Sequence, residues 1–109
     1  HLPGFRDKAT ELHGKGVDLI ACTAVNDAFV MGAWGKDQNA GETILMLADG
    51  NGDFAKAVGL DADFSKFGMG LRSQRYSMLV KDGVVQQLHV EEPSEYKVSS
   101  AEHMLGQLD

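Results

Sequence analysis

The sequence predicts a single α/β domain. Two nearly continuous apolar segments, at residues 17–24 and 43–48, flank a segment with helical spacing, and an alternating apolar pattern follows on both sides of Asp82-Gly83. Apolar runs of this length are typical of parallel strands that are covered on both faces, and alternation around a two-residue turn is typical of an antiparallel hairpin. With 109 residues, 43% of them apolar, the chain is long enough to build one core.

The first part of the chain is expected to begin with a helix. Apolar residues with helical spacing occur at Leu2, Phe5, Ala9 and Leu12. This helix would end at Gly14 or Gly16, because glycine adopts the left-handed conformation that ends many helices. The apolar spacing is already under way at residue 2, so we expect this sequence to be a fragment of a longer protein.

A strand, a helix and a second strand are expected next. Residues 17–24 form the first strand, and Asn26 or Asp27 caps a helix that runs to about Asn39. The residues of this helix expected to face inward are Phe29, Val30, Ala33 and Trp34. Residues 43–48 then form a second strand parallel to the first, which makes a right-handed crossover unit.

The second half of the chain is expected to hold a short helix, a hairpin and a last helix. The short helix covers about residues 54–58 and ends at Gly59. The hairpin pairs residues 76–80 with residues 84–90, and Asp82-Gly83 makes its turn. Ser99 and Glu102 have the spacing of a capping box at the start of the last helix, whose apolar residues are Met104, Leu105 and Leu108.

Composition and charge exclude several classes of partner. A net charge of −6 and a pI of about 5.0 argue against nucleic acid or an anionic membrane as a partner, since both attract basic surfaces. The sequence has no run of eighteen apolar residues and no signal-peptide pattern at its start. Its single cysteine excludes an internal disulfide framework and fits a reducing compartment, for which we expect the cytoplasm.

Metal and cofactor motifs are incomplete in this sequence. Asp49, Asn51 and Asp53 imitate the start of a calcium loop, but Phe54 stands where that loop needs glycine. Gly68 and Gly70 lack the third glycine of a dinucleotide motif, and the four histidines lack the spacing of a zinc site. We therefore expect neither a metal ion nor a cofactor.

The order of these elements is that of a thioredoxin-like fold without its leading strand. Four blocks resemble the peroxiredoxin 5 subfamily: HLPGF at 1–5, ACTAVNDAFVMGAWG at 21–35, LADGNGDFAKAVGL at 47–60 and RSQRYSMLVKDGVV at 72–85. The resemblance covers almost the whole chain in the right order. It implies that residues 1–109 are the C-terminal two-thirds of one thioredoxin-like peroxiredoxin domain, without its N-terminal strands and its reactive-cysteine loop.

The resemblance also implies an activity and a site. Members of the subfamily are thiol peroxidases that reduce hydrogen peroxide and alkyl hydroperoxides, and their peroxidatic cysteine would lie four residues ahead of His1. Arg75 matches the catalytic arginine, which would stabilise the thiolate and hydrogen-bond the peroxide. His1 would be either an exposed residue or a pocket wall or hydrogen-bond partner. Phe67 would line the hydroperoxide pocket, pack in the core, or do both. Residues 1–109 alone are expected to be inactive, because the nucleophile is not among them.

Other positions have more than one interpretation. Cys22 is either a small buried hydrophobic residue or a second redox thiol, as considered for some plant-type relatives. Ser99 stands where two-cysteine animal members have a resolving cysteine, so the resemblance implies glutathione with glutaredoxin, or thioredoxin, as the reductant. A homodimer is expected from the resemblance alone. Arg72 is expected at the surface or an interface, and Phe29 and Trp34 in the core or a dimer contact.

Two other classes of function stay open at this point. The chain could be a thioredoxin-fold binding module without a reactive segment, which would show no peroxidase activity even in the intact protein. It could also be a thiol enzyme that uses Cys22 itself, which requires that thiol to be exposed and close to a cation.

Overall fold

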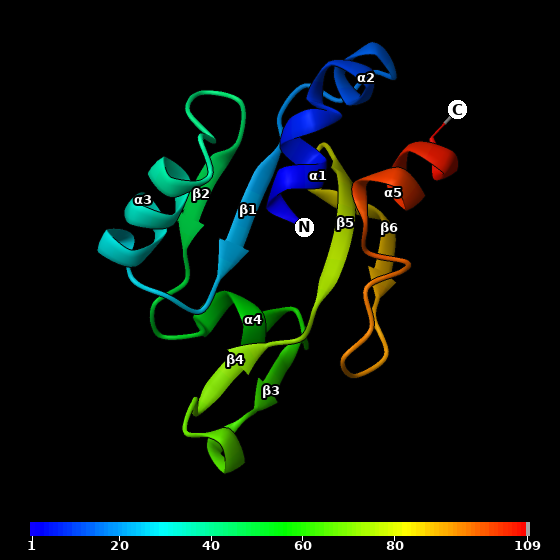
Figure 1. Cartoon of the computed structure of the whole chain (residues 1–109). Helices are drawn as coiled ribbons and strands as arrows, with labels where there is room; N and C mark the ends of the chain where they lie inside the picture. Colours follow the sequence, from blue (N-terminus) through cyan, green and yellow to red (C-terminus); the bar gives the residue numbers. More distant parts are fainter. Residues whose placement is uncertain (109) are drawn as a thin grey trace. The chain divides into compact units, whose positions relative to one another are not determined.

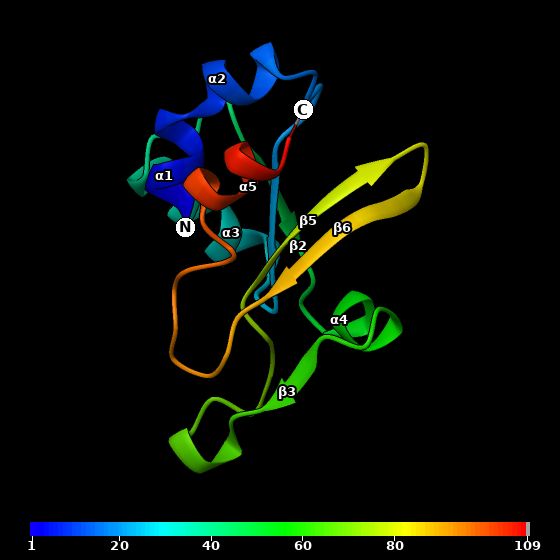
Figure 2. The same cartoon turned by 90° about the vertical axis from the view of Figure 1, so that its right-hand side faces the viewer.

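The computed structural model describes residues 1–108, in which the chain forms two compact units (Figures 1 and 2). The first, which we call the βαβ unit, comprises residues 18–74 together with Leu2. The second, which we call the hairpin unit, comprises His1, residues 3–17 and the chain from Arg75 onward. Within residues 1–108, no helix combines the length and the apolar character that crossing a membrane requires.

The predicted crossover is present in the βαβ unit. Strand β1 (Ala21–Ala24) runs parallel to β2 (Leu45–Ala48), with Cys22 opposite Met46, and helix α3 (Ala28–Asp37) lies beside them. Both strands are shorter than expected. The side chains of β2 are also largely exposed, 48% for Leu45 and 43% for Leu47. The expectation of strands covered on both faces is therefore wrong for β2, because a short apolar run does not reveal how many of its faces are packed.

Helix α3 starts where the sequence places it but buries a different face. Of the two candidate caps it is Asp27 that acts, since its Oδ1 accepts a hydrogen bond from Val30 N at 2.8 Å. The buried residues are Met31 and Gly35, one turn apart. A Cβ at Gly35 would lie only 3.1 Å from Met46 Cγ, so the missing side chain lets β2 approach the helix closely.

The inward residues expected for α3 are therefore wrong in part. Phe29 is 89% exposed, and Val30 and Ala33 are exposed as well, whereas Trp34 is half-buried. The two bulky residues at the start of the helix suggested the wrong face, because the residue that allows the closest packing is a glycine, which carries no apolar signal.

The rest of the βαβ unit contains a short helix and a small antiparallel pair. The carboxylate of Asp49 binds the start of α4 (Asp53–Ala57), accepting hydrogen bonds from Phe54 N at 3.0 Å and Ala55 N at 2.9 Å. Strands β3 (Asp61–Asp63) and β4 (Leu71–Ser73) then pair around the 3₁₀ turn η1 (Ser65–Phe67). The sequence pattern did not predict this pair, because strands of three residues are too short to show alternation.

The hairpin unit contains the predicted hairpin. Strands β5 (Tyr76–Lys81) and β6 (Val84–Val90) are antiparallel, with an irregularity between Leu79 and Val80 (Figure 2). Asp82 and Gly83 have φ angles of 52° and 77°, the left-handed values that a tight two-residue turn requires. The first expected helix is instead two, α1 (Leu2–Asp7) and α2 (Ala9–Gly14), which are separated at Lys8.

The last helix, α5 (Ala101–Gln107), begins one residue later than expected. Its N-cap is Ser100, whose Oγ accepts a hydrogen bond from His103 N at 3.1 Å. The predicted capping box of Ser99 and Glu102 is therefore wrong, because the adjacent Ser100 occupies the capping position. Ser99 is instead fully buried, with an exposure of 0%, and its hydroxyl is used elsewhere.

Candidate functional site

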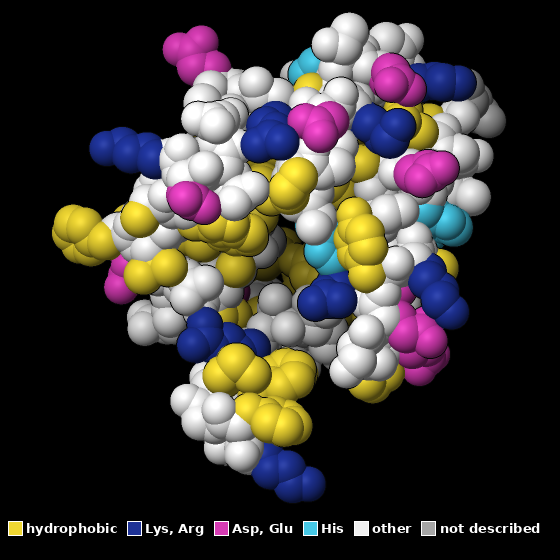
Figure 3. Space-filling model, viewed as in Figure 1, with side chains coloured by type: hydrophobic (Ala, Val, Ile, Leu, Met, Phe, Trp, Pro, Cys, Tyr) yellow, Lys and Arg dark blue, Asp and Glu magenta, His cyan; other side chains and the backbone are white. Residues whose placement is uncertain are grey.

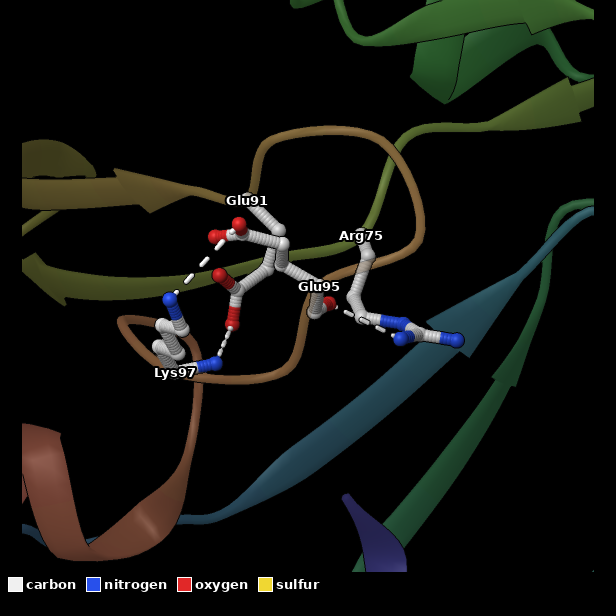
Figure 4. Close-up of polar contacts among 4 residues, drawn as sticks. All are labelled: Arg75, Glu91, Glu95 and Lys97. Atoms are coloured by element: carbon white, nitrogen blue, oxygen red, sulfur yellow. Dashed lines mark hydrogen bonds and ion pairs between the residues drawn. The ribbon is translucent and has the colours of Figure 1, made fainter.

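Arg75 is held at two points of the segment that follows β6. Residues 91–100, which we call the 91–100 segment, connect β6 to α5. The guanidinium Nη1 of Arg75 donates to the backbone oxygen of Glu95 at 2.9 Å (Figure 4). Glu91 N donates to the backbone oxygen of Arg75 at 2.9 Å. Arg75 lies directly before β5. Its side chain is exposed, yet the hydrogen bond defines the direction of the guanidinium.

His1 contacts the same segment next to the position that holds Arg75. Its ring packs edge-on against Tyr96, with centroids 4.5 Å apart and an interplanar angle of 87°. Its Nε2 lies 2.5 Å from Ser99 Oγ. Arg75 and His1 therefore meet consecutive residues, Glu95 and Tyr96, although the structure gives no direct bond between them within residues 1–108. The 91–100 segment thus contacts both of the candidate residues that belong to the hairpin unit, Arg75 and His1.

Glu91 organises the 91–100 segment from its buried start. Its side chain has an exposure of only 8%, and its Oε2 accepts hydrogen bonds from Ser99 Oγ at 2.6 Å, Ser99 N at 2.9 Å and Lys97 N at 2.5 Å. Burial by itself raises the pKa of this carboxyl, but the hydrogen bonds from Ser99, Lys97 and Val98 outweigh burial and lower the pKa to about 2. Glu91 is therefore a carboxylate at neutral pH.

The pKa of Glu91 predicts how acid affects stability. Its folded-state pKa of about 2 lies below the ordinary value of 4.5, so ionised Glu91 stabilises the fold at neutral pH. This contribution is complete above about pH 4.5 to 5 and is lost as the pH falls toward 2. We expect the midpoint of urea unfolding to fall across this range by more in the wild type than in Glu91→Gln. Parallel pH profiles of the two proteins would contradict this assignment.

Phe67 is placed in the other unit, in η1 of the βαβ unit. Its side chain is 71% exposed and lies near Phe64, with ring centroids 6.5 Å apart. Figure 3 shows hydrophobic side chains standing at the surface over the β3–β4 pair. Core packing, one of the two interpretations of Phe67, is therefore wrong, and its role in lining a hydroperoxide pocket stays a prediction.

Cys22 is half-buried on β1. Burial raises the pKa of its thiol, which disfavours the reactive thiolate. Its neighbour across the parallel pair is Met46, an apolar residue that gives no stabilisation to an anion. These properties favour the interpretation of Cys22 as a small hydrophobic residue over that of an enzymatic nucleophile.

Arg72 has a structural role that sequence reasoning missed. Its Nη1 donates to Val25 O and to Asn26 Oδ1, both at 3.0 Å, and its Nε donates to Met69 O at 3.0 Å. The half-buried guanidinium thus ties β4 to the turn after β1 within the βαβ unit. The expectation of a surface or interface arginine is wrong, because the spacing of Arg72 and Arg75 does not show which of them has internal acceptors.

Glu91, Tyr96 and Ser99 are the other residues that sequence reasoning did not place at the site. Glu91 is followed by Glu92 in an acidic run, and nothing in the sequence distinguishes the buried carboxylate from the exposed one. Ser99 was interpreted as part of a capping box and as the position of the animal resolving cysteine, and neither interpretation connects it with His1. In the part of the chain that the structure describes, no group of three or more His, Cys, Asp or Glu side chains could hold a metal ion.

The chain is similar to known peroxiredoxins over nearly its whole length. The family model described as Redoxin matches residues 1–105. Peroxiredoxin-2E-2, a chloroplastic protein of Oryza sativa, is 51% identical over 99% of this chain and 49% of its own length. The chain therefore spans about half the length of that curated relative. Arabidopsis thaliana Peroxiredoxin-2B is 44% identical and is covered over 67% of its length.

Solved structures agree with this relationship. Reduced Prx3 from Vibrio vulnificus, in complex with hydrogen peroxide, has a TM-score of 0.94 and 58% identity, and the match covers 99% of this chain and 69% of that one. The corresponding values for peroxiredoxin 5 from Alvinella pompejana are 0.84 and 37%, over 96% of this chain and 65% of that one. The predicted thioredoxin-like fold is therefore confirmed.

The expectation of a cytoplasmic location is wrong. The names of the relatives from rice and Arabidopsis include chloroplastic and mitochondrial peroxiredoxins. Our expectation rested on a single cysteine and on the start of the sequence, and neither reports a compartment reliably. Leader segments carry such addresses and lie outside the folded domain.

The match over residues 1–105, the relatives at 44% to 58% identity and the shared fold point to one family. The blocks of sequence that resemble the peroxiredoxin 5 subfamily lie in that matched region, and Arg75 and His1 lie within them. The chain thus belongs to the redoxin family, as a peroxiredoxin of the peroxiredoxin 5 type.

Proposed function

We propose that the intact protein is a thiol peroxidase that reduces hydrogen peroxide and small alkyl hydroperoxides. The observation that carries the proposal is the shared attachment of Arg75 and His1 to the 91–100 segment. The nucleophile is a cysteine four residues ahead of His1, where the family has its peroxidatic cysteine. The attachment of the guanidinium and the imidazole to one segment supports a common role for both side chains at the proposed thiol.

Arg75 has the chemistry that a peroxide-reducing thiolate needs. A free thiol with a pKa of about 8.5 is mostly protonated at neutral pH, and a neighbouring cation lowers the pKa and favours the nucleophilic form. The guanidinium has five N–H donors, and the bond to Glu95 uses one of them. Within residues 1–108 the structure gives the others no acceptor, so they can bind the sulfur anion and the peroxide oxygens.

The proposed reaction has a simple balance. The thiolate sulfur attacks one peroxide oxygen, an S–O bond forms, and the O–O bond breaks. The leaving oxygen takes a proton and departs as water or an alcohol, while the sulfur becomes a sulfenic acid. The donors of Arg75 stabilise the negative charge that moves from sulfur to oxygen in the transition state.

An external thiol must then reduce the sulfenic acid. Ser99, which stands at the position of the animal resolving cysteine, has no thiol and is fully buried. The half-buried Cys22 has a raised pKa. We therefore propose a one-cysteine cycle that is completed by an external thiol, either glutathione with glutaredoxin or thioredoxin. We also propose that the intact protein is a homodimer.

The test is peroxide turnover by the intact protein, which includes the residues that precede His1. We expect the residue four positions before His1 to be cysteine, and its replacement by serine to reduce turnover to the uncatalysed background. Cys22→Ser is the matched control, since it removes the other thiol and is expected to keep the activity. A residue other than cysteine at that position, or an active serine variant, would overturn the proposal. An inactive wild type with all residues in place would support the binding-module alternative.

A further inference from the structure

Hydrogen bonds link His1 Nε2 to Ser99 Oγ, and Ser99 Oγ to the buried carboxylate of Glu91. They determine which nitrogen of the His1 ring carries the proton. We propose that Glu91 and Ser99 are positioning residues, which hold the imidazole of His1 with its proton on Nε2 and leave Nδ1 as the proton acceptor. This inference rests on the proposed function, since it assigns His1 a task in peroxide reduction. It concerns residues of the hairpin unit alone.

The direction of each hydrogen bond follows from counting protons. Ser99 Oγ has one proton and lies 2.6 Å from Glu91 Oε2 and 2.5 Å from His1 Nε2. Glu91 is ionised, so its oxygens only accept hydrogen bonds, and the hydroxyl proton of Ser99 points to the carboxylate. Towards His1 the same hydroxyl can then only accept. His1 Nε2 must therefore be the donor, and in the neutral ring Nδ1 has the free lone pair.

The Glu91 carboxylate, at the end of this hydrogen-bond network, cannot easily rearrange. Glu91 Oε2 also accepts hydrogen bonds from the backbone N–H groups of Lys97 and Ser99. The 91–100 segment therefore holds the carboxylate in place. Glu91 has an exposure of 8% and Ser99 of 0%, which leaves little room for water to take the place of either partner. The edge-on packing of Tyr96 restricts the ring of His1 from a second direction. The tautomer and the orientation of His1 are thus defined together.

This arrangement provides an acceptor for the proton that the proposed reaction moves. The thiol loses a proton when it ionises, and Nδ1 of neutral His1 can accept it to form an imidazolium that keeps Nε2–H bonded to Ser99. After the thiolate attacks and the O–O bond breaks, Nδ1 returns that proton to the leaving oxygen. Sulfur is oxidised to the sulfenic acid, the peroxide is reduced, and His1 ends in the form in which it began.

The test combines the nitrogen NMR spectrum of His1 with peroxide turnover, both in the intact protein. At a pH where the ring is neutral, we expect the ¹⁵N signal of Nε2 in the protonated range and that of Nδ1 in the unprotonated range. In Glu91→Gln the new amide can donate to Ser99, which frees the hydroxyl to donate to His1. The Nδ1–H tautomer should then appear, and kcat/KM for hydrogen peroxide should fall roughly tenfold. Glu92→Gln, which alters the exposed neighbour, should change neither signal nor rate.

A second variant distinguishes the proposed positioning role from a loss of folded structure. Ser99→Ala removes the hydroxyl, so the preference for Nε2–H and the rate should both fall while the far-UV circular dichroism stays that of the wild type. If that variant does not fold, the Glu91→Gln result decides. A wild-type ring with its proton on Nδ1 overturns the inference, as does a Glu91→Gln protein with the changed tautomer and an unchanged rate. If the wild type has no turnover at all, the proposed function fails, whereas turnover with the wrong tautomer refutes only this inference.

Discussion

Replacing Arg75 with alanine in the intact protein is expected to lower kcat/KM for hydrogen peroxide by about 10²- to 10³-fold. This is the typical effect of removing a hydrogen-bond donor that stabilises developing negative charge, and Arg75 would also lose its charge. The guanidinium is directed by its bond to the Glu95 carbonyl at 2.9 Å, so its position is set before substrate arrives. Initial rates of peroxide consumption, measured at several peroxide concentrations, give the result.

One further variant separates charge from geometry at this position, and a second variant is its control. Arg75→Lys keeps the charge but replaces the planar fork with a single ammonium, so we expect only part of the rate to return. Arg6→Lys is the matched control, because Arg6 belongs to the same unit and pairs with Asp7 at 3.1 Å on the helix surface. That control should retain wild-type rates. A rate for Arg75→Ala within a factor of about two of the wild type would remove Arg75 from the proposed mechanism.

The pKa of the proposed thiol gives an independent measure of the role of Arg75. Rates of alkylation at different pH values report the fraction of thiolate, since only the thiolate reacts. We expect the alkylation midpoint of Arg75→Ala to lie at higher pH than that of the wild type. An unchanged midpoint together with a large loss of rate would mean that Arg75 acts on the peroxide rather than on the sulfur.

The elements with strong local signals were predictable from the sequence. Asp82-Gly83 between alternating segments is sufficient to specify the hairpin, because both residues must adopt positive φ and the flanking strands must then pair. Asp27 was one of two candidate caps for α3, and its side chain binds the helix start. The parallel pair of β1 and β2 followed from two apolar runs on either side of a helix.

The buried face of α3 and the role of Ser99 could not be predicted in this way. Gly35 lies at the closest contact between α3 and β2, and Ser99 has no exposed surface. Both roles depend on the residues that pack around them. The capping pattern of Ser99 was a real local signal, but Ser100 offered the same chemistry one residue later. Tertiary partners decided between the two serines, and a sequence pattern contains no information about such partners.

The candidate site was likewise predictable only in part. Arg75, His1 and Phe67 were found by resemblance, which transfers positions from relatives without explaining what holds them. The residues that support Arg75 and His1, Glu91 above all, come from a connection with few regular signals. A buried glutamate that accepts several N–H groups is visible only once the 91–100 segment has been folded around it.

Replacing Ile44 with alanine is expected to lower the free energy of unfolding by about 2 to 5 kcal/mol. Ile44 immediately precedes β2 and has an exposure of only 2%, so its removal loses buried apolar area and leaves a cavity that a packed core closes only partly. Denaturant unfolding of the intact protein gives the value. A loss below about 1 kcal/mol would show that the site collapses around the smaller residue or is not packed as the structure describes.

The adjacent Leu45 is the matched control, and it also decides how β2 is packed. Leu45 is 48% exposed, so Leu45→Ala should cost about 1 kcal/mol or less, in proportion to the smaller apolar area that it buries. Leu45 is the first residue of β2 and Ile44 immediately precedes it, so the two variants compare an exposed position with a buried one at the start of the strand. If both losses were equally large, the intact protein would cover the side chain of Leu45 as well, as the apolar run of residues 43–48 suggested. A large loss for Ile44→Ala alone means that Ile44 carries the packing where β2 begins, and that Leu45 is exposed in the folded intact protein.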